Sequence, residues 1–250
     1  MFKGFYNLTS AMLTHQHNLN VVGNNLVNMS TAGFKQERYL ASTFDEVMYS
    51  RVGNKYETGE EIGQQSYIRA TSDVYTDHSR GTLEPTGIPL DFAINGEGFF
   101  AIRNEAGDIF YTRMGNFSLD EEGYLCLPGY GRVLDPTEQD IYMATDRVGG
   151  MMGNYIRYEE GGYLAQLGVF TFEDVDALER NDLGMFIGEG AQAAENPEVF
   201  NGFLERSNTD MTQQMTEMIT MQRALQSAAA VSRIYDELMS RVTTDIGRMG

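Results

Sequence analysis

The stretch from Asn208 to Met249 constrains the fold more than any other part of the sequence, because it contains no proline and no glycine before Gly247. Its apolar residues recur at spacings of three or four, as they do on one face of a helix. They are Met211, Met215, Met218, Met221, Leu225, Ala228, Val231, Ile234, Leu238, Val242 and Ile246. A continuous helix of this length would measure about 60 Å, since each residue adds about 1.5 Å. Such a helix has to bury its apolar stripe against a partner.

A second heptad pattern lies at the opposite end of the sequence. If His15 is included, the spacings alternate between four and three along Leu8, Met12, Leu19, Val22, Leu26 and Met29. They predict a helix from about Leu8 to Met29, with Asn7 or Thr9-Ser10 as its N-cap and Gly33 just beyond its end. The two terminal helices are each other's nearest candidate partners. Because one stripe contains histidine and the other relies on methionine and alanine, we expect neighbouring subunits to complete the burial.

Between these helices, glycine residues separate short apolar and aromatic runs typical of β-strands. The runs are LDFAI, GFFAI, DIFYT, NFSL, YLCL, YIRY and LGVFTF, with turn signals such as Asn95-Gly96 and Glu122-Gly123 between them. The fold predicted is α+β, with N- and C-terminal heptad helices forming a coiled-coil-like layer and an all-β domain inserted between them. The expected divisions are an N-terminal assembly helix (1–34), an extended connector (35–81), the β domain (82–205) and a C-terminal assembly helix (206–250).

Composition narrows the range of functions. The formal net charge is -18, the pI is about 4.4 and the 18 basic residues are scattered, so we expect no binding to nucleic acid or to anionic lipid. The single cysteine, Cys126, cannot form an internal disulfide. No run approaches the roughly 20 apolar residues of a membrane span, and the N-terminal segment lacks the apolar core of a cleaved secretion signal. Any export is therefore expected to use another route.

The sequence contains few patterns typical of catalysis or metal binding. His15 and His17 lie two residues apart, so on a helix they point to different faces and cannot chelate one ion. His78 has no cysteine or histidine at ligand spacing, and the acidic stretch 120–123 lacks the ligand alternation of a calcium loop. There is no third glycine for a nucleotide fingerprint and no G-x-S-x-G. We expect no cofactor and no metal, although 36 acidic residues leave a paired-carboxylate site open.

The segment NVVGNNLVNMSTAGFKQER, residues 20–38, places Asn24, Asn25 and Asn28 in the last turns of the N-terminal helix. Asparagine amides donate and accept hydrogen bonds but do not exchange protons near neutral pH. A helix end needs only Ala32-Gly33, whereas three amides on more than one side of a helix are typical of a crowded bundle. We predict that they fix the register between packed helices and that Gly33-Phe34 turns the chain outward.

The same segment resembles the N-terminal signature of bacterial flagellar axial proteins, the rod and hook group. The matching residues are Asn24, Asn25, Leu26, Asn28, Thr31, Gly33, Phe34 and Lys35. Residues 86–125 resemble the start of that family's β domain, and residues 202–239 resemble its C-terminal helix. The length and the single β domain are similar to rod proteins rather than to the hook protein. The chain departs from the pattern at Met114, at Leu225 and across residues 136–163.

This resemblance implies a structural, non-enzymatic subunit of the flagellar basal body. In that family the terminal helices form an inner coiled-coil layer, the β domain lies outside it, and subunits polymerise into a hollow helical shaft that transmits torque to the hook and filament. Its implied partners are other copies of the chain, other rod and hook subunits and the flagellar type III export apparatus, which exports such proteins without a cleaved signal.

The assembly interface predicted from these patterns combines both helices with the segment that follows the first. Its residues are Leu8, Met12, Leu19, Val22, Asn24, Asn25, Leu26, Asn28, Gly33, Phe34, Met211, Met215, Met218, Leu225, Ile234 and Leu238. Two alternatives from other classes remain open. One is a coiled-coil adaptor that displays a β-rich binding module, and the other is a hydrolase with a carboxylate site in the β domain.

Overall fold

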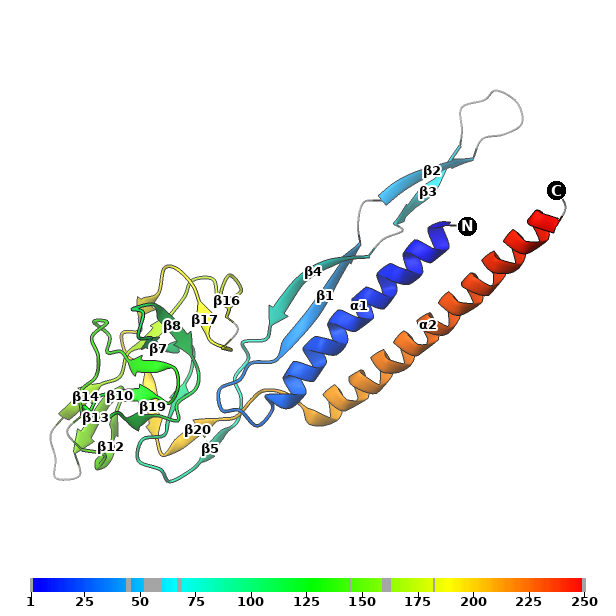
Figure 1. Cartoon of the computed structure of the whole chain (residues 1–250). Coiled ribbons are helices and arrows are strands. Elements are labelled where there is room, and N and C mark those ends of the chain that lie inside the picture. Colours follow the sequence, from blue (N-terminus) through cyan, green and yellow to red (C-terminus); the bar gives the residue numbers. More distant parts are fainter. Residues whose placement is uncertain are drawn as a thin grey trace. The chain divides into compact units, whose positions relative to one another are not determined.

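The computed structural model describes residues 2–43, 46–51, 60–66, 69–143, 145–158, 163–181 and 183–248. The chain forms two compact units (Figure 1). We call the first the helical unit, which comprises Met1–Leu26, Glu37–Tyr75 and Asp210–Gly250, and the second the β unit, which comprises Val27–Gln36 and Thr76–Thr209. Helices at both ends of the sequence flank a β-rich region, which confirms the predicted α+β class.

The helical unit contains both long helices, α1 (Phe2–Val27) and α2 (Met211–Arg248). The predicted start of α1 near Leu8 is wrong, and its expected N-cap residues lie inside the helix. The Thr9 hydroxyl donates to the carbonyl of Phe5 at 3.0 Å, a bond back along the helix that lets the backbone continue. At α2, the Asp210 carboxylate caps the first turn by accepting from the Thr212 backbone N–H at 2.8 Å.

Four strands also belong to the first half of the chain, where the sequence predicted only an extended connector. They are β1 (Glu37–Thr43), β2 (Glu46–Arg51), β3 (Glu60–Ser66) and β4 (Arg69–Thr76). Strand β1 pairs with β4, and β2 forms an antiparallel pair with β3. Their sequences are polar and lack a regular alternation of apolar residues, so periodicity could not reveal the pairing.

Among the described residues, the β unit is built from antiparallel strands, and its largest sheet contains nine of them. Its members are β7 (Phe99–Arg103), β8 (Ile109–Thr112), β9 (Ser118–Leu119), β10 (Leu125–Leu127), β11 (Gly131–Val133), β15 (Val169–Thr171), β16 (Glu179–Arg180), β17 (Phe186–Ile187) and β18 (Gln192–Ala193). A second sheet contains β12 (Val148–Met152), β13 (Tyr155–Tyr158) and β14 (Tyr163–Gln166). Two further pairs are β6 (Phe92–Asn95) with β19 (Glu198–Asn201) and β5 (Leu83–Pro85) with β20 (Phe203–Glu205).

Each of the seven apolar runs identified in the sequence contains a strand of this unit, so that prediction is confirmed. The Asn95-Gly96 turn does not join two paired strands, however. Strand β6 pairs with β19, with Ile94 opposite Val199, rather than with the β7 strand that follows it. A turn signal gives the place of a chain reversal but not the partner of the strand that precedes it.

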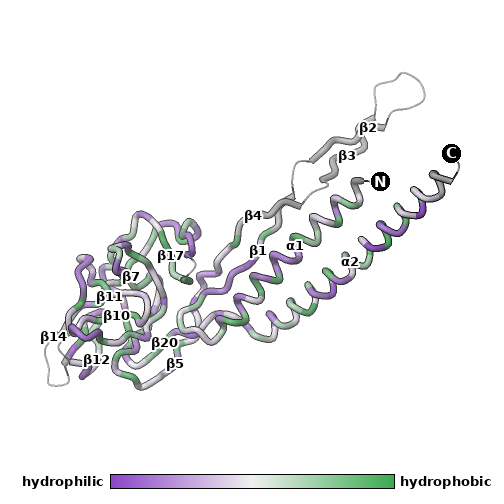
Figure 2. Tube along the Cα trace, viewed as in Figure 1, coloured by the Kyte–Doolittle hydropathy of each residue, from purple (hydrophilic) through white to green (hydrophobic). Residues whose placement is uncertain are grey.

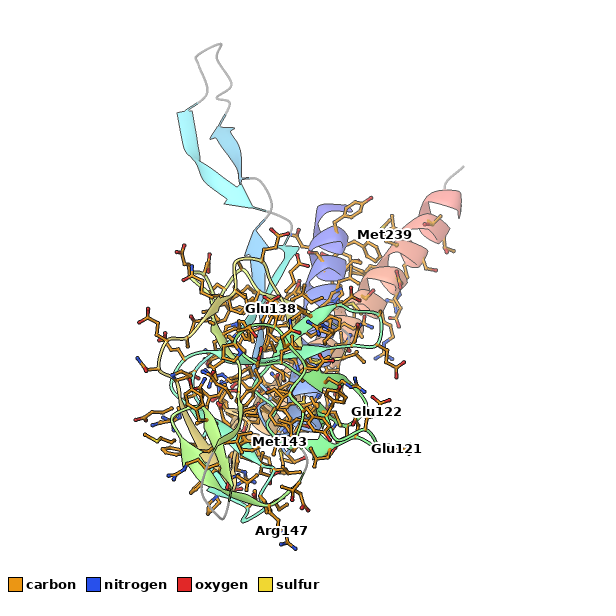
Figure 3. The ribbon with its side chains drawn as sticks, turned by 90° about the vertical axis from the view of Figure 1, so that its left-hand side faces the viewer. Glu121, Glu122, Glu138, Met143, Arg147 and Met239 are labelled. Carbon is orange, nitrogen blue, oxygen red and sulfur yellow. The ribbon has the colours of Figure 1, made fainter. Side chains whose placement is uncertain are left out.

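Strand β7 lies between two apolar cores, as the alternation of side chains along a strand requires. Phe100 and Ile102 belong to the larger core, whereas Phe99 and Ala101 belong to the smaller one. Met143 lies within the larger core, and Arg147 extends from the margin of the unit (Figure 3). The β unit therefore has apolar cores of its own.

Candidate assembly site

The two helices meet at a buried amide contact at the C-terminal end of α1. The side chain of Asn25, with 1% of its surface exposed, donates to the Gln214 side-chain oxygen on α2 at 3.2 Å. The same amide nitrogen donates to the Glu37 carbonyl at 2.7 Å, and the amide oxygen accepts from the Glu37 backbone N–H at 2.9 Å. We call Asn25, Glu37 and Gln214 the amide hub. One side chain thus joins α1, α2 and the start of β1.

The contacts between the helices follow a heptad in antiparallel register. Moving seven residues back along α1 from Asn25 reaches Asn18, and seven forward along α2 from Gln214 reaches Met221, whose sulfur lies 3.7 Å from the Asn18 amide nitrogen. At the far end, a Cβ placed on Gly4 would lie 2.7 Å from the Tyr235 hydroxyl. The steps from Asn18 to Gly4 and from Met221 to Tyr235 are both fourteen residues long. The helices are therefore paired along most of α1.

This contact is centred one position away from the predicted stripe of α1. Asn18 and Asn25 precede Leu19 and Leu26, and successive residues of a helix point about 100° apart. Val22 is buried, while Leu8, Met12, Leu19 and Leu26 are half-buried in the isolated chain. Asn24 is exposed and Asn28 is half-buried, so of the three asparagines only Asn25 is buried.

On α2, several of the predicted apolar interface residues remain exposed. Ile234 and Leu238 have 57% and 54% of their surfaces exposed, and Met211 and Met215 are also exposed. Met218 and Leu225 are half-buried. Figure 2 shows apolar residues recurring along the whole described length of α2 among polar ones. The pairing with α1 therefore covers only part of the apolar surface of this helix.

The segment after α1 lies in the β unit. Gly33 has a φ of 69°, and a Cβ at this residue would lie 2.3 Å from the Arg113 carbonyl carbon and 2.5 Å from the Met114 nitrogen. Only glycine fits such a close approach of two backbones at a positive φ. The side chain of Phe34 is buried, and the Arg180 guanidinium carbon lies 4.3 Å from the centre of its ring. The structure thus places both residues inside the β unit.

Three buried charged residues lie beside this segment, and we call them the ion cluster. The Glu205 carboxylate accepts from the Lys35 ammonium at 2.6 Å and from the Arg113 guanidinium at 3.3 Å. Burial lowers the pKa of Lys35 and that of Arg113, and in each case the Glu205 carboxylate opposes the shift. A buried pair of this kind is costly to break, because the remaining charge would be left without its partner.

The sequence did not single out Lys35, Arg113 or Glu205 as a group. Lys35 belongs to the family motif, but Arg113 and Glu205 lie far from it along the chain. A weak signal was present, because Lys35 follows Phe34 and Glu205 follows Leu204, so each charge is next to an apolar residue. Charges in such positions are occasionally buried in pairs, but sequence spacing cannot identify the partner.

A depression on the β unit is lined by Glu105, Asp120 and Asp140, and both aspartates bind an arginine. Arg132 contacts Asp120 at 3.0 Å and Glu122 at 2.6 Å, and Arg103 contacts Asp140 at 2.7 Å. Burial raises the pKa of Asp120, but the backbone N–H groups of Tyr124 and Glu122, together with Arg132, hold it below its ordinary value. In the described part of the chain no cluster of metal-ligating side chains occurs, and no helix is long and apolar enough to span a membrane.

Three stretches of the chain match models of flagellar protein families. Residues 5–35 match the flagella basal body rod protein model, and residues 93–148 match the D1 domain of the flagellar hook protein FlgE/F/G. Residues 201–245 match the C-terminal region of the flagellar basal body rod FlgEFG protein.

The chain is also similar to whole flagellar proteins. It is 31% identical to the flagellar basal-body rod protein FlgG of Bacillus subtilis (strain 168), over 97% of this chain and 98% of that protein. The chain belongs to the flagellar basal-body rod protein family. FlgG of Agrobacterium fabrum (strain C58 / ATCC 33970) is 30% identical over 95% of this chain and 97% of that protein. The flagellar hook-basal body complex protein FlhO of Bacillus subtilis is 28% identical over 100% of both.

Apart from Glu37, the residues of the amide hub and of the ion cluster lie in the regions that match the flagellar family models. Asn25 and Lys35 lie in the N-terminal match, Arg113 lies in the central one, and Glu205 and Gln214 lie in the C-terminal one. The amide hub and the ion cluster therefore each join separate family regions through side chains buried in the subunit.

Proposed function

We propose that this chain is a structural subunit of the bacterial flagellar basal-body rod, which polymerises through α1 and α2 into a hollow helical shaft that transmits torque to the hook and filament. The observation that carries the proposal is the incomplete burial of α2. Large apolar side chains, including Ile234 and Leu238, remain exposed although the helix is already paired with α1. Contiguous exposed apolar surface of this kind is typical of a protein interface.

The polar and the apolar residues of the helices fit two different roles in this proposal. The amide hub requires a unique partner for each hydrogen bond, and polar pairs at single heptad positions fix register at a cost in stability. The apolar side chains are less selective and are left for neighbouring subunits. The residues of the predicted interface that fit this role are Leu8, Met12, Leu19, Leu26, Met211, Met215, Met218, Leu225, Ile234 and Leu238.

Subunits of one kind extend into a shaft when the surfaces in contact are different and the rotation between subunits does not close a ring. In this proposal the partners are other copies of this chain and other flagellar axial proteins in the basal body. The flagellar export apparatus delivers the subunit without a cleaved signal. The functional divisions are assembly helices at 1–34 and 206–250, the connector at 35–81 and the β domain at 82–205.

The proposed role requires no catalysis. The hydrolase alternative would need a carboxylic acid whose pKa is raised enough to donate a proton near neutral pH. In the arginine-lined depression the pKa of Asp120 is instead held below its ordinary value. The adaptor alternative would leave the helices of a stable dimer protected from protease, whereas rod subunits are expected to be trimmed at their ends before assembly.

The direct test is to delete the gene and to examine basal bodies by electron microscopy. A complete rod and hook in the deletion strain would refute the proposal. A sharper variant is Ile234→Asp with Leu238→Asp, which places two charges on surface that the isolated subunit leaves exposed. We expect normal folding by circular dichroism but no rod in the complemented strain. Gln226→Asp with Gln222→Asp adds the same charge at exposed polar residues of the same helix and serves as the control.

The predicted seam itself is tested by Leu26→Asp together with Leu225→Asp. Both residues are half-buried in the isolated chain, so the double variant is expected to prevent assembly while the β unit stays folded. Normal rods built from this variant would exclude the seam from the interface.

A further inference from the structure

The chain passes between the helical unit and the β unit at four points, after residues 26, 36, 75 and 209. On the β-unit side, three segments next to these points are bonded to one another: residues 33–36, 77–82 and 205–208. Such connections are ordinarily the flexible part of a chain with two units. We propose that Lys35, Arg113, Glu205 and Asn208 form a collar that locks these three segments together, so that force enters the β unit through one rigid base.

Glu205 supplies the centre of the collar. One carboxylate oxygen accepts from the Lys35 ammonium at 2.6 Å and from the Gly81 backbone N–H at 2.9 Å, and the other accepts from Arg113. The Glu205 backbone carbonyl accepts from the Gly33 N–H at 2.7 Å. A single residue therefore binds the segment after α1, the segment after β4 and the body of the β unit.

Asn208 makes a second, uncharged set of links among the same segments. Its amide oxygen accepts from the Gln36 backbone N–H at 2.8 Å, and its amide nitrogen donates to the carbonyls of Asp77 at 2.8 Å and Ser79 at 3.2 Å. The Asp77 N–H in turn donates to the Gln36 carbonyl at 2.8 Å. These bonds repeat the connections made by Glu205 without using any charge.

Lys35 is the third member of the collar, and its ammonium group bonds two of the segments at once. Its ammonium donates to the Ser79 carbonyl at 2.8 Å as well as to Glu205. The side chains of Lys35 and Glu205 are each only 1% exposed, so neither charge is screened by water. Hydrogen bonds between charged groups are strong at buried sites. If one of these bonds broke, a charged group would remain buried without a partner, which is costly. The three segments therefore separate only if several buried bonds break together.

The test uses hydrogen exchange measured by mass spectrometry on the purified full chain. In Glu205→Gln, we expect the amides of Gly33, Gln36, Asp77 and Gly81 to exchange at least about tenfold faster, while those of β7 and β10 are unchanged. Asn208→Ala removes only the uncharged links and should accelerate exchange in the same segments. The control is Glu84→Gln, which removes a carboxylate from an exposed ion pair with Arg206 and should change nothing in these segments.

Two results would overturn the collar. One is unchanged exchange at these amides in both variants. The other is an equal acceleration of amide exchange in β7, which would show that Glu205 and Asn208 stabilise the whole β unit rather than the three segments. Because these measurements use the isolated chain, they stand whether or not the chain is a rod subunit.

The mechanical role rests on the proposed function and has its own test. A strain that carries Asn208→Ala is expected to assemble complete rods and to swim normally in dilute medium, but to lose speed more steeply than the Glu84→Gln strain as viscosity rises. Equal speeds in viscous medium, with the collar shown to be open by exchange, would overturn the mechanical role. A complete rod in the deletion strain would instead refute the proposed function and leave the collar in place.

Discussion

The two units of this chain differ in how far they bury their apolar side chains. In the β unit, Phe100, Ile102 and their neighbours are fully buried in a closed core. In the helical unit, the buried contact between the helices is a hydrogen bond between Asn25 and Gln214, while Ile234 and Leu238 remain exposed. A sequence can therefore contain regular apolar periodicity without burying it in the same subunit. The β unit has buried cores of its own, whereas the helical unit leaves several large apolar side chains exposed.

The largest expected effect comes from truncating the β core. Phe100→Ala removes a fully buried ring that packs against Phe117 with 5.1 Å between ring centres. We expect a loss of about 3–5 kcal/mol in the free energy of unfolding, as for other buried phenylalanines. Phe200→Ala, at an exposed phenylalanine of the same unit, is the control. Urea denaturation followed by tyrosine fluorescence measures both, and equal effects would contradict the difference in burial.

A smaller effect is expected from the amide hub. Asn25→Leu leaves the Glu37 N–H and carbonyl without their side-chain partner, which costs about 1–3 kcal/mol when such groups stay buried. The loss should appear as faster hydrogen exchange in α1, with the β unit unchanged and the subunit still soluble. Ordered assembly should be impaired. The control is Asn24→Leu, at the exposed neighbouring residue. Equal exchange rates in the two variants would show that the amide hub does not fix the register of the helices.

The third effect is a dependence of the free energy of unfolding on pH, caused by a histidine of the β unit. Burial, followed by the nearby Lys35 ammonium, lowers the pKa of His78 below its ordinary 6.5. The unfolded chain then binds this proton more readily than the folded chain, so the free energy of unfolding should fall as the pH drops below about 6.5. The acidic groups that oppose the shift, Asp176 and Asp77, limit its size.

Urea denaturation of the wild-type chain and of His78→Gln, between about pH 7.5 and about pH 5.5, measures this dependence. The variant should lose part of the decline in stability on acidification. Substitution of His17, which is exposed on α1, is the comparison. A decline that is identical in the wild type and His78→Gln would show that other groups cause it.

The smallest effect on stability is expected on the exposed face of α2. Leu238→Ala should change the free energy of unfolding of the isolated chain by no more than about 0.5 kcal/mol, since the side chain is largely exposed. The same substitution should nevertheless weaken assembly, measured as the fraction of cells with complete basal bodies. A loss of stability as large as that of Phe100→Ala would show that Leu238 is buried within the subunit in solution.

Local patterns predicted the helices and seven of the sixteen strands described in the β unit, because periodicity depends on neighbouring residues. The heptads located α1 and α2, and the glycine-bounded runs located strands such as β7 and β10. The same local information predicted a role in register for the asparagines, and the structure shows Asn25 at the contact between the helices. It could not show that Glu37 would be its second partner, because that contact depends on how the chain returns after Gly33.

Long-range contacts account for what the sequence did not predict. Lys35, Arg113 and Glu205 come from three distant parts of the chain, and no spacing rule links them. Strands β1 to β4 were missed because polar strands produce no apolar alternation. The Gly33 motif was visible, but its reason is the backbone of Arg113 and Met114 against which it packs.

The amide of Asn25 also has a consequence for the margin of the first strand. By bonding both the N–H and the carbonyl of Glu37, it takes the place that the backbone of another extended chain would occupy. Unpaired strand margins are sites where foreign strands add and aggregation begins. A helix side chain thus blocks strand addition at the beginning of β1, in a subunit whose second helix already exposes large apolar residues.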